Sequence, residues 1–410
     1  MPNRTVAAAG TPSPTARPRG GETRGNRGTR RLRRESGVRR ALWAVCASSA
    51  VLFPAGLCPP VAVAEPAPGA VMSVEPLPPE LSVPGAAVAE RFTYRTQWRS
   101  GAAAVDTGVL FLPPGPAPEG GRPVVSWAHG TVGLGDDCAP SRNPRVDREQ
   151  RYLAHWLSQG YAVVAADYPG LGTDGLHTYL DGPTAANSVI DVVRAARAVE
   201  PSLSPRWVVV GQSQGGHAAL HTAHRATSRA PELDFRGAVA TGAPSNLELL
   251  FPFGVPGFPD LGLDGLVPFS AYIMAGLRAA RPDLGVDGYL TPVGRELVDA
   301  AERLCYSELE DRAAGVAVGQ LLSRPLGDDR MRAALADYLG VPVRGYDRPL
   351  FLGQGLDDRM VPAPLSFKLV ADLWAGGAEV DYRTYPADHF ATIFEALPDT
   401  TGFVAARFVP

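Results

Sequence analysis

The sequence predicts an α/β fold in which a mostly parallel sheet is covered by helices on both faces. Apolar runs of strand length alternate with helical segments along most of the chain, a pattern that is typical of parallel sheets. One apolar run, Trp207-Val-Val-Val210, leads directly into a glycine-rich turn at 211–216 that precedes a helical stretch. The 410 residues, 45% of them hydrophobic, suffice for one large domain with an insertion.

The expected elements follow the chain in order. Strands are expected at 91–100 and 105–112, which can pair antiparallel, and then at 161–167, 207–210, 349–353 and 379–385. Helices are expected at 147–159, 184–199, 217–229, 364–374 and 391–407. The expected domains are a signal peptide at 1–64, a leader rich in Pro and Ala at 65–88, a core at 89–244 and 346–410, and a helical lid or cap inserted at 245–345.

Ser213 is the candidate nucleophile, at the centre of Gly211-x-Ser213-x-Gly215. A serine hydroxyl is a weak nucleophile at neutral pH, so it must be held on a sharp strand-to-helix turn that a base and backbone N–H groups can reach. The small flanking residues let such a turn pack closely. An ordinary glycine-rich turn is the alternative, because the motif is short and the chain contains 45 glycines.

His389 is the candidate base and Asp358 the candidate acid. A serine in this motif is followed along the chain by an acid and then by a histidine. Of the seven histidines, only His389 lies beyond the helix that follows Ser213; a solvated loop histidine is the alternative. The pattern Gly355-x-x-Asp358-x-x-Val-Pro after a strand favours Asp358 as the group that orients the imidazole. Asp357 stays open, because spacing alone does not separate adjacent loop residues.

Two backbone N–H groups are expected to stabilise the oxyanion. Such stabilisation supplies a large share of the rate enhancement in these enzymes. One belongs to Gln214, directly after the nucleophile. The other belongs to Thr131, because a strand that begins at Arg122 ends in His129-Gly130-Thr131. His129 is interpreted as a histidine that bonds backbone groups and shapes this loop, since no cluster of ligands has the spacing of a metal site. Neither a metal nor a cofactor is expected.

Several segments together resemble one known family. They are Ser126-Trp-Ala-His-Gly-Thr-Val-Gly133, Cys138-Ala-Pro-Ser141, Ala166-Asp-Tyr-Pro-Gly-Leu-Gly-Thr173 with His177 and Tyr179-Leu180, Gly211 to Gly216, and Gly355 to Pro362. This combination resembles the secretory lipases, the lipase A-like α/β-hydrolases of fungi and actinobacteria, over most of residues 90–408. The resemblance implies an α/β-hydrolase fold, hydrolysis of triacylglycerol or other carboxylic esters, and a helical lid between the serine half and the acid and histidine half.

The insertion is rich in apolar residues between 249 and 274. In a lid these side chains would line an acyl pocket and contact a lipid interface transiently. Alternatively, they form the insertion's own core.

The N-terminal 64 residues have the composition of a secretory signal peptide. Eleven arginines precede an apolar stretch at 41–57, and Val61-Ala-Val-Ala64 offers a cleavage site. The pair Arg39-Arg40 leaves twin-arginine export open beside the general secretory route. A basic nucleic-acid arm and a membrane anchor are the alternatives, although the apolar stretch contains Pro54 and is shorter than the ~20 residues of a span. We therefore expect a secreted protein.

Removal of this segment changes the charge and the cysteine content. The remaining chain carries 28 basic and 40 acidic residues, a net charge of −12, which argues against nucleic-acid binding. Cys138 and Cys305 are the two cysteines that remain. An even pair in an oxidising compartment favours a disulfide, here between the oxyanion-side loop and the lid. Two separate buried thiols are the alternative.

The expected function is that of a secreted serine hydrolase, which transfers an acyl group to Ser213 while His389 acts first as base and then as acid. The substrate would be a small-molecule or lipid ester, and no protein partner is implied. A peptidase or an acyltransferase on the same fold is the first alternative. A non-catalytic binding protein on a hydrolase fold is the second, although it would require a broken set of catalytic residues.

Overall fold

The computed structural model describes residues 67–263 and 265–409, which belong to one compact unit. The expected signal peptide at 1–64 therefore lies outside the described residues, as do the first two residues of the expected leader. In the described ranges, no helix has both the length and the apolar character needed to cross a membrane.

A nine-stranded sheet forms the centre of the unit, in the order β1-β2-β3-β5-β4-β6-β7-β8-β9. The first three strands join it antiparallel and all later pairs are parallel, which confirms the expected mostly parallel sheet and the antiparallel pairing of the early strands. The strands are β1 (Val71–Pro76), β2 (Val88–Gln97), β3 (Ala103–Leu112), β4 (Arg122–Ala128), β5 (Ala162–Ala166), β6 (Leu203–Gln212), β7 (Asp234–Thr241), β8 (Leu350–Gly355) and β9 (Val380–Tyr385).

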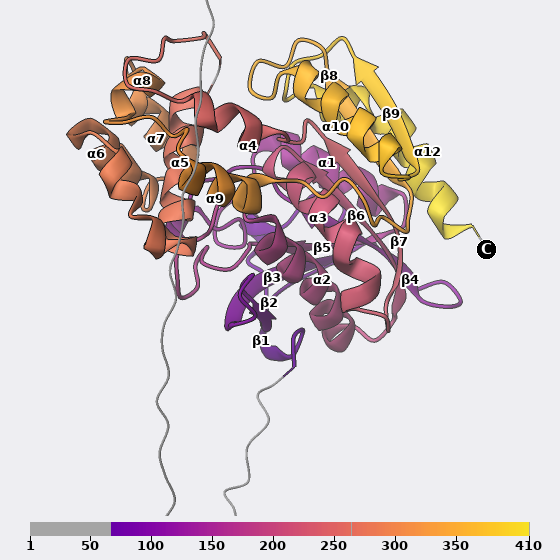
Figure 1. Cartoon of the computed structure of the whole chain (residues 1–410). Helices are drawn as coiled ribbons and strands as arrows, with labels where there is room; N and C mark the ends of the chain where they lie inside the picture. Colours follow the sequence, from indigo (N-terminus) through magenta and orange to yellow (C-terminus); the bar gives the residue numbers. More distant parts are fainter. Residues whose placement is uncertain (1–66, 264, 410) are drawn as a thin grey trace, which may run out of the picture. The chain divides into compact units, whose positions relative to one another are not determined.

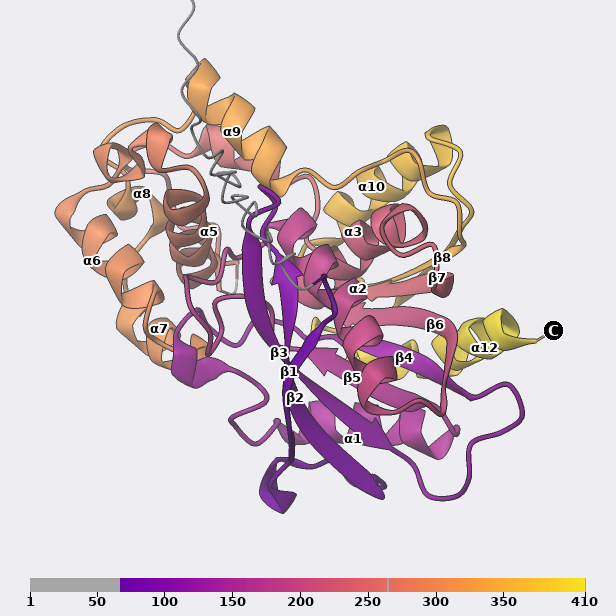
Figure 2. The same ribbon diagram turned by 90° about the horizontal axis from the view of Figure 1, so that it is seen from below.

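Helices cover both faces of this sheet. The helices α2 (Gly182–Val199), α3 (Gln214–Arg229) and α10 (Ala363–Ala375) pack on one face. On the other face lie α1 (Asp147–Ser158) and α12 (Leu397–Phe408) (Figure 2). The short helix α11 (Thr392–Glu395) packs into the same core. Successive strand residues point to opposite faces, so Val124 joins the first core and Val125 the second. Apolar residues on both faces of a strand are what a doubly covered sheet requires.

The helical insertion, residues 245–345, follows β7 and has a core of its own. Figure 1 shows α5 to α9 gathered on one side of the sheet, away from the C-terminal helix α12. A separate cluster of buried side chains, with Tyr272, Leu297, Met331 and Leu335 among them, holds these helices together. The helices are α4 (Leu247–Leu250), α5 (Leu266–Ala280), α6 (Pro292–Ala301), α7 (Tyr306–Ala313), α8 (Val318–Leu321) and α9 (Asp329–Leu339).

Three details differ from the expected elements. The single helix expected at 391–407 is divided into α11 and α12, because Pro398 has no N–H to donate to the preceding turn. Strand β7 was not expected, since a glycine at 237 interrupts its short apolar run. Finally, β1 arises within the stretch expected as a leader and pairs with β2 at the edge of the sheet.

Candidate active site

Ser213 occupies a strained turn between β6 and α3. Its φ of 58° and ψ of −125° are unusual for a residue with a side chain, and its N–H donates to the carbonyl oxygen of Thr241 at 2.9 Å. The turn depends on the small residues beside it. A Cβ at Gly211 would lie 2.1 Å from the carbonyl oxygen of Gly215, and a Cβ at Gly215 would lie 1.8 Å from that of Ala128. Any larger side chain at either position would push the turn away from the sheet.

Asp358 and His389, 31 residues apart in the sequence, are joined by a hydrogen bond. His389 Nδ1 lies 2.7 Å from Asp358 Oδ2, and both side chains are buried. The other carboxylate oxygen accepts the N–H groups of Met360 and Val361 at 2.9 and 2.7 Å. These bonds hold the carboxylate in place. The neighbouring Asp357 is exposed, and of the two carboxylates Asp358 is the one bonded to the imidazole.

Contacts between the loops bring His389 to the turn of Ser213. Gln212, the residue before Ser213, donates from Nε2 to the backbone oxygen of His389 at 3.0 Å. Gly242 lies directly beside the imidazole, because a Cβ there would be 3.2 Å from both Cε1 and Nδ1 of His389. Because Nδ1 is bonded to Asp358, Nε2 is the ring nitrogen that can bond to a group in the cavity. Ser213 and His389 line the same cavity.

Two compartments meet at Ser213. The larger compartment has a volume of about 480 Å³ and is lined by mixed groups, including His389, Arg145, Arg148 and Glu149. The smaller compartment, of about 70 Å³, is lined almost wholly by apolar side chains, half of them from the helical insertion. These are Tyr179, Leu180, Pro244, Leu247, Phe251, Leu263, Leu266, Phe269, Ile273, Met360, Val361 and Leu365, with Ser270 as the polar exception beside Ser213.

The loop after β4 reaches the larger compartment with Gly130, Thr131 and Val132. Gly130 is close to the turn, since a Cβ there would lie 3.7 Å from the Cβ of Ser213. The Thr131 hydroxyl is 2.6 Å from the hydroxyl of Tyr179, which fixes the loop from its far side. Gln214 begins α3, and its side-chain amide lies 2.8 Å from Nε2 of His177. Burial lowers the pKa of His177 to about 3, so this imidazole is neutral at ordinary pH.

His129 and Asp167 brace the same loop from below. The ring nitrogens of His129 lie 2.7 Å from the carbonyl oxygen of Gly130 and 3.0 Å from that of Asp167. The Asp167 carboxylate accepts the N–H of Ser141 at 2.9 Å, and burial raises the pKa of this carboxyl. Both residues therefore act on the backbone, as the sequence interpretation of His129 expects. In the described part of the chain, no group of His, Cys, Asp and Glu side chains could hold a metal ion.

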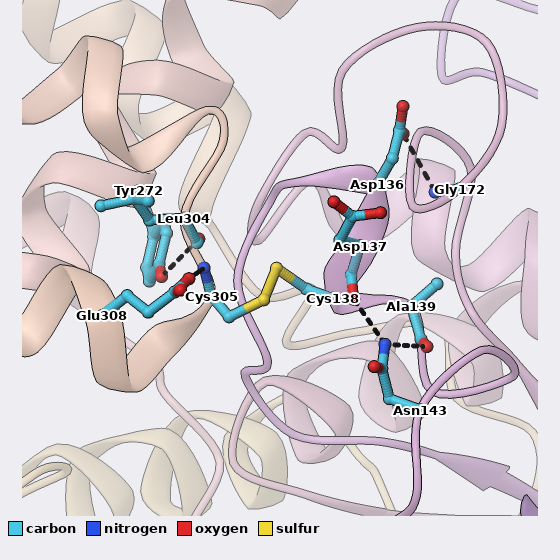
Figure 3. Close-up of a disulfide and its surroundings, with 10 residues drawn as sticks. All are labelled: Asp136, Asp137, Cys138, Ala139, Asn143, Gly172, Tyr272, Leu304, Cys305 and Glu308. Atoms are coloured by element: carbon cyan, nitrogen blue, oxygen red, sulfur yellow. Dashed lines mark hydrogen bonds between the residues drawn. A yellow bond between two sulfur atoms is a disulfide. The ribbon is translucent and has the colours of Figure 1, made fainter.

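The expected disulfide between Cys138 and Cys305 is present and joins the wall of the larger compartment to the insertion (Figure 3). Cys305 caps α7, and its N–H donates to Glu308 at 3.0 Å. The segment around it also pairs with the loop after β4, through a bridge between Gly133 and Cys305 and a 2.9 Å hydrogen bond from the N–H of Tyr306 to Val132. The insertion is thus covalently fixed beside the loop that carries Thr131.

Charged side chains of α1 line the larger compartment. The Arg145 guanidinium donates to Glu149, which also accepts the indole N–H of Trp127 at 2.7 Å. Burial alone would raise the pKa of Glu149, but Arg145 and His129 hold it below the ordinary value. Arg148 lies over the ring of Phe390, 4.4 Å from its centroid, and its pKa is lowered by burial.

Some residues of the site were not expected from the sequence. Gly242 and Arg148 belong to segments with no recognisable motif. A glycine directly after a strand was the one available signal for Gly242, whereas nothing in the local sequence marks Arg148.

Comparison with known proteins finds lipases among the relatives of this chain. The family described as secretory lipase matches residues 140–307. Lipase A of Moesziomyces aphidis is 25% identical over 362 residues, 80% of this chain and 74% of that protein. A probable inactive lipase of Mycobacterium tuberculosis is also 25% identical, over 346 residues, 80% of this chain and 75% of that protein.

Solved structures share the fold. Candida antarctica lipase A superposes with a TM-score of 0.70 at 22% identity, covering 84% of this chain and 83% of that one. The rice cell wall degrading esterase of Xanthomonas oryzae gives a TM-score of 0.67 at 21% identity, covering 83% and 98%. The α/β-hydrolase fold that the sequence predicts is therefore confirmed. The chain is thus similar to the secretory lipases over residues 140–307 and to lipase A over most of its length, and it shares the fold of solved lipases and esterases.

Proposed function

We propose that the protein is a secreted serine esterase of the lipase type, with Ser213, His389 and Asp358 as its catalytic triad and the N–H groups of Thr131 and Gln214 as its oxyanion hole. The observation that carries this proposal is the 2.7 Å bond between His389 and Asp358, formed beside a serine in a strained turn. A buried aspartate in that position fixes the imidazole tautomer that can accept a proton at Nε2.

The proposed reaction has two halves. Nε2 of His389 takes the proton of the Ser213 hydroxyl as Oγ attacks the ester carbonyl, and the two N–H groups stabilise the oxyanion. The imidazolium then protonates the departing alcohol oxygen, which leaves the acyl group on Ser213. In the second half, His389 takes a proton from water as the water oxygen attacks the acyl carbon. The free acid leaves and the serine regains its proton.

The two compartments support a division of the substrate. The imidazolium must reach the leaving oxygen, so the alcohol half lies on the side of His389. His389 lines the larger compartment but not the smaller one. The smaller, apolar compartment therefore remains for the acyl chain. Burial of an acyl chain against these side chains is favourable by roughly 0.8 kcal/mol for each methylene.

We also propose that the helical insertion acts as the lid and contacts a lipid interface. Leu249, Leu250, Phe253 and Leu261 are each about half exposed or more on its outer segment. Such a concentration of exposed apolar groups is typical of a surface that meets lipid. Export of the protein is supported by the disulfide, because such bonds persist in oxidising compartments.

Covalent labelling tests the triad directly. A fluorophosphonate probe should label the wild-type protein at Ser213, and Ser213→Ala should abolish both labelling and hydrolysis of p-nitrophenyl butyrate. A Ser307→Ala variant, which removes a second hydroxyl lining the same compartment, is the matched control and should still be labelled. If wild-type protein with the correct fold is not labelled, the proposal is wrong and the chain resembles its inactive relative in function.

A further inference from the structure

The larger compartment contains an arginine that forms no ion pair with the carboxylates around it. Arg148 lines this compartment together with His389 and Phe390. In the described part of the chain it forms no ion pair, and its Nη1 is buried without a hydrogen-bond partner. Its nearest carboxylates, Glu149 and Asp388, act on it only at longer range. A buried nitrogen of this kind requires an explanation, since such groups are rare in folded proteins.

The carboxylates around Arg148 act on it without forming an ion pair. Glu149 is already bonded to Arg145 and to the indole of Trp127. Asp388 accepts the N–H groups of Phe390 and Ala391 at 2.9 and 2.7 Å through Oδ1, and it acts on Arg148 only through its charge. Asp137 also lines the compartment but is exposed at its rim, where water screens its charge. The cation of Arg148 therefore remains available to a ligand.

Arg148 is also held in a fixed position. Its guanidinium lies 4.4 Å from the centroid of the Phe390 ring, and Phe390 directly follows His389. A cation fixed beside the imidazole lies on the side from which the alcohol oxygen must leave. Because guanidinium forms strong, directional bonds to carboxylate and phosphate, its place in the compartment indicates the chemistry of the alcohol half.

We propose that Arg148 makes this enzyme selective for esters whose alcohol half carries an anionic group, a carboxylate or a phosphate. This inference rests on the proposed function, because it needs the leaving group to lie on the side of His389. It narrows the substrate class from carboxylic esters in general to acyl esters of alcohols and phenols that carry a carboxylate or a phosphate. The acyl chain would still enter the smaller apolar compartment.

A pair of matched esters tests the selectivity. The butyrate ester of 4-hydroxybenzoate has an anionic leaving group, and the butyrate ester of methyl 4-hydroxybenzoate has a neutral one of similar shape. The ratio of kcat/KM for the anionic ester to that for the neutral ester is measured for each enzyme. Differences in intrinsic reactivity cancel when this ratio is compared between enzymes. We expect Arg148→Gln to lower the ratio about tenfold, and Arg148→Lys, which keeps the charge, to lower it less.

Arg151 provides the matched control. It lies one turn further along α1 and stacks on Phe394 at 5.1 Å, but it does not line the compartment. Arg151→Gln should leave the ratio within about twofold of wild type, because it removes a stacked cation that no ligand reaches. A ratio unchanged in Arg148→Gln would overturn the inference. So would an equal loss for both esters, which would mean that Arg148 only holds the His389 loop.

Binding separates this inference from the proposed function. In the Ser213→Ala background, calorimetry should show tighter binding of 4-hydroxybenzoate than of neutral 4-hydroxybenzamide, and adding Arg148→Gln should remove the difference. Equal binding of the two compounds to Ser213→Ala would overturn the inference alone. Hydrolysis that survives in Ser213→Ala would instead overturn the proposed function.

Discussion

The two compartments that meet at Ser213 differ in what builds them. The smaller one is formed by apolar side chains, half of them from the helical insertion, with Leu266, Phe269 and Ile273 from α5. The larger one is formed mainly by loops of the core and by the N-terminal turn of α1, with a smaller share from the insertion around Cys305, and it contains two arginines, a glutamate and an aspartate. An insertion can change its apolar residues without disturbing the sheet, whereas the residues of the core loops also support the catalytic groups.

This difference suggests that the two halves of a substrate are recognised by physically separate parts of the chain. Acyl length would be set by the volume and apolar surface of the insertion, and the leaving group by charge and by the loops near His389. Variants confined to one compartment should therefore change one property and leave the other, while variants of the shared catalytic groups should affect both.

The largest effect is expected from Asp358→Asn. Loss of the carboxylate would leave the imidazole in the wrong tautomer, and kcat should fall about 10⁴-fold for every acyl length and leaving group alike. Asp357→Asn is the matched control, because Asp357 is adjacent but exposed, and its activity should stay within a few fold of wild type. Steady-state kinetics on p-nitrophenyl esters measures both. A greater loss of kcat in Asp357→Asn than in Asp358→Asn would show that Asp358 is not the catalytic acid.

Removal of the disulfide should have the next largest effect, on stability. Cys138 and Cys305 close a long loop. Both line the larger compartment, and neither lines the smaller one. The double variant Cys138→Ser/Cys305→Ser should lower the free energy of unfolding by about 2–5 kcal/mol in urea denaturation. In the folded variant, discrimination between leaving groups should weaken while the acyl-length profile is kept.

The comparison for the disulfide is the reduced wild-type protein, which should unfold at the same urea concentration as the double variant. A double variant as stable as the oxidised protein would show that the bond does not hold the insertion to the core.

Leu266→Trp should have the smallest of these effects. Leu266 is partly exposed and lines the smaller compartment, so a larger side chain can fill part of its roughly 70 Å³ without breaking the core. We expect kcat/KM for octanoyl esters to fall about tenfold relative to acetyl esters, since a methylene that no longer fits costs about 1–3 kcal/mol. Preference between leaving groups should be unchanged.

Val293→Trp, on the exposed side of α6 and outside both compartments, is the control for Leu266→Trp. An acyl profile that shifts in the control as strongly as in Leu266→Trp would mean that the insertion responds as a whole, without a defined acyl compartment.

Much of the site was predictable because its chemistry imposes an order on the chain. The motif at the end of a strand identifies Ser213 as the candidate nucleophile. Chain order then selects His389 from the seven histidines as the candidate base. The pattern after β8 favoured Asp358 but left Asp357 open, because the choice between them depends on how one loop turns. Pro398 was a local signal that the last helix is divided, but the helical periodicity of 391–407 favoured a single helix.

The amino-acid sequence by itself determined the α/β class, the candidate nucleophile, the candidate base and the pair of cysteines, because each follows from a local pattern or from a limited set of residues. Only the tertiary structure decided which groups surround the reacting atoms. Gly242 beside the imidazole, Tyr179 against Thr131 and Arg148 over Phe390 are contacts between distant segments. Such contacts depend on how the sheet, α1 and the insertion pack together, and that packing leaves no periodic trace in the sequence.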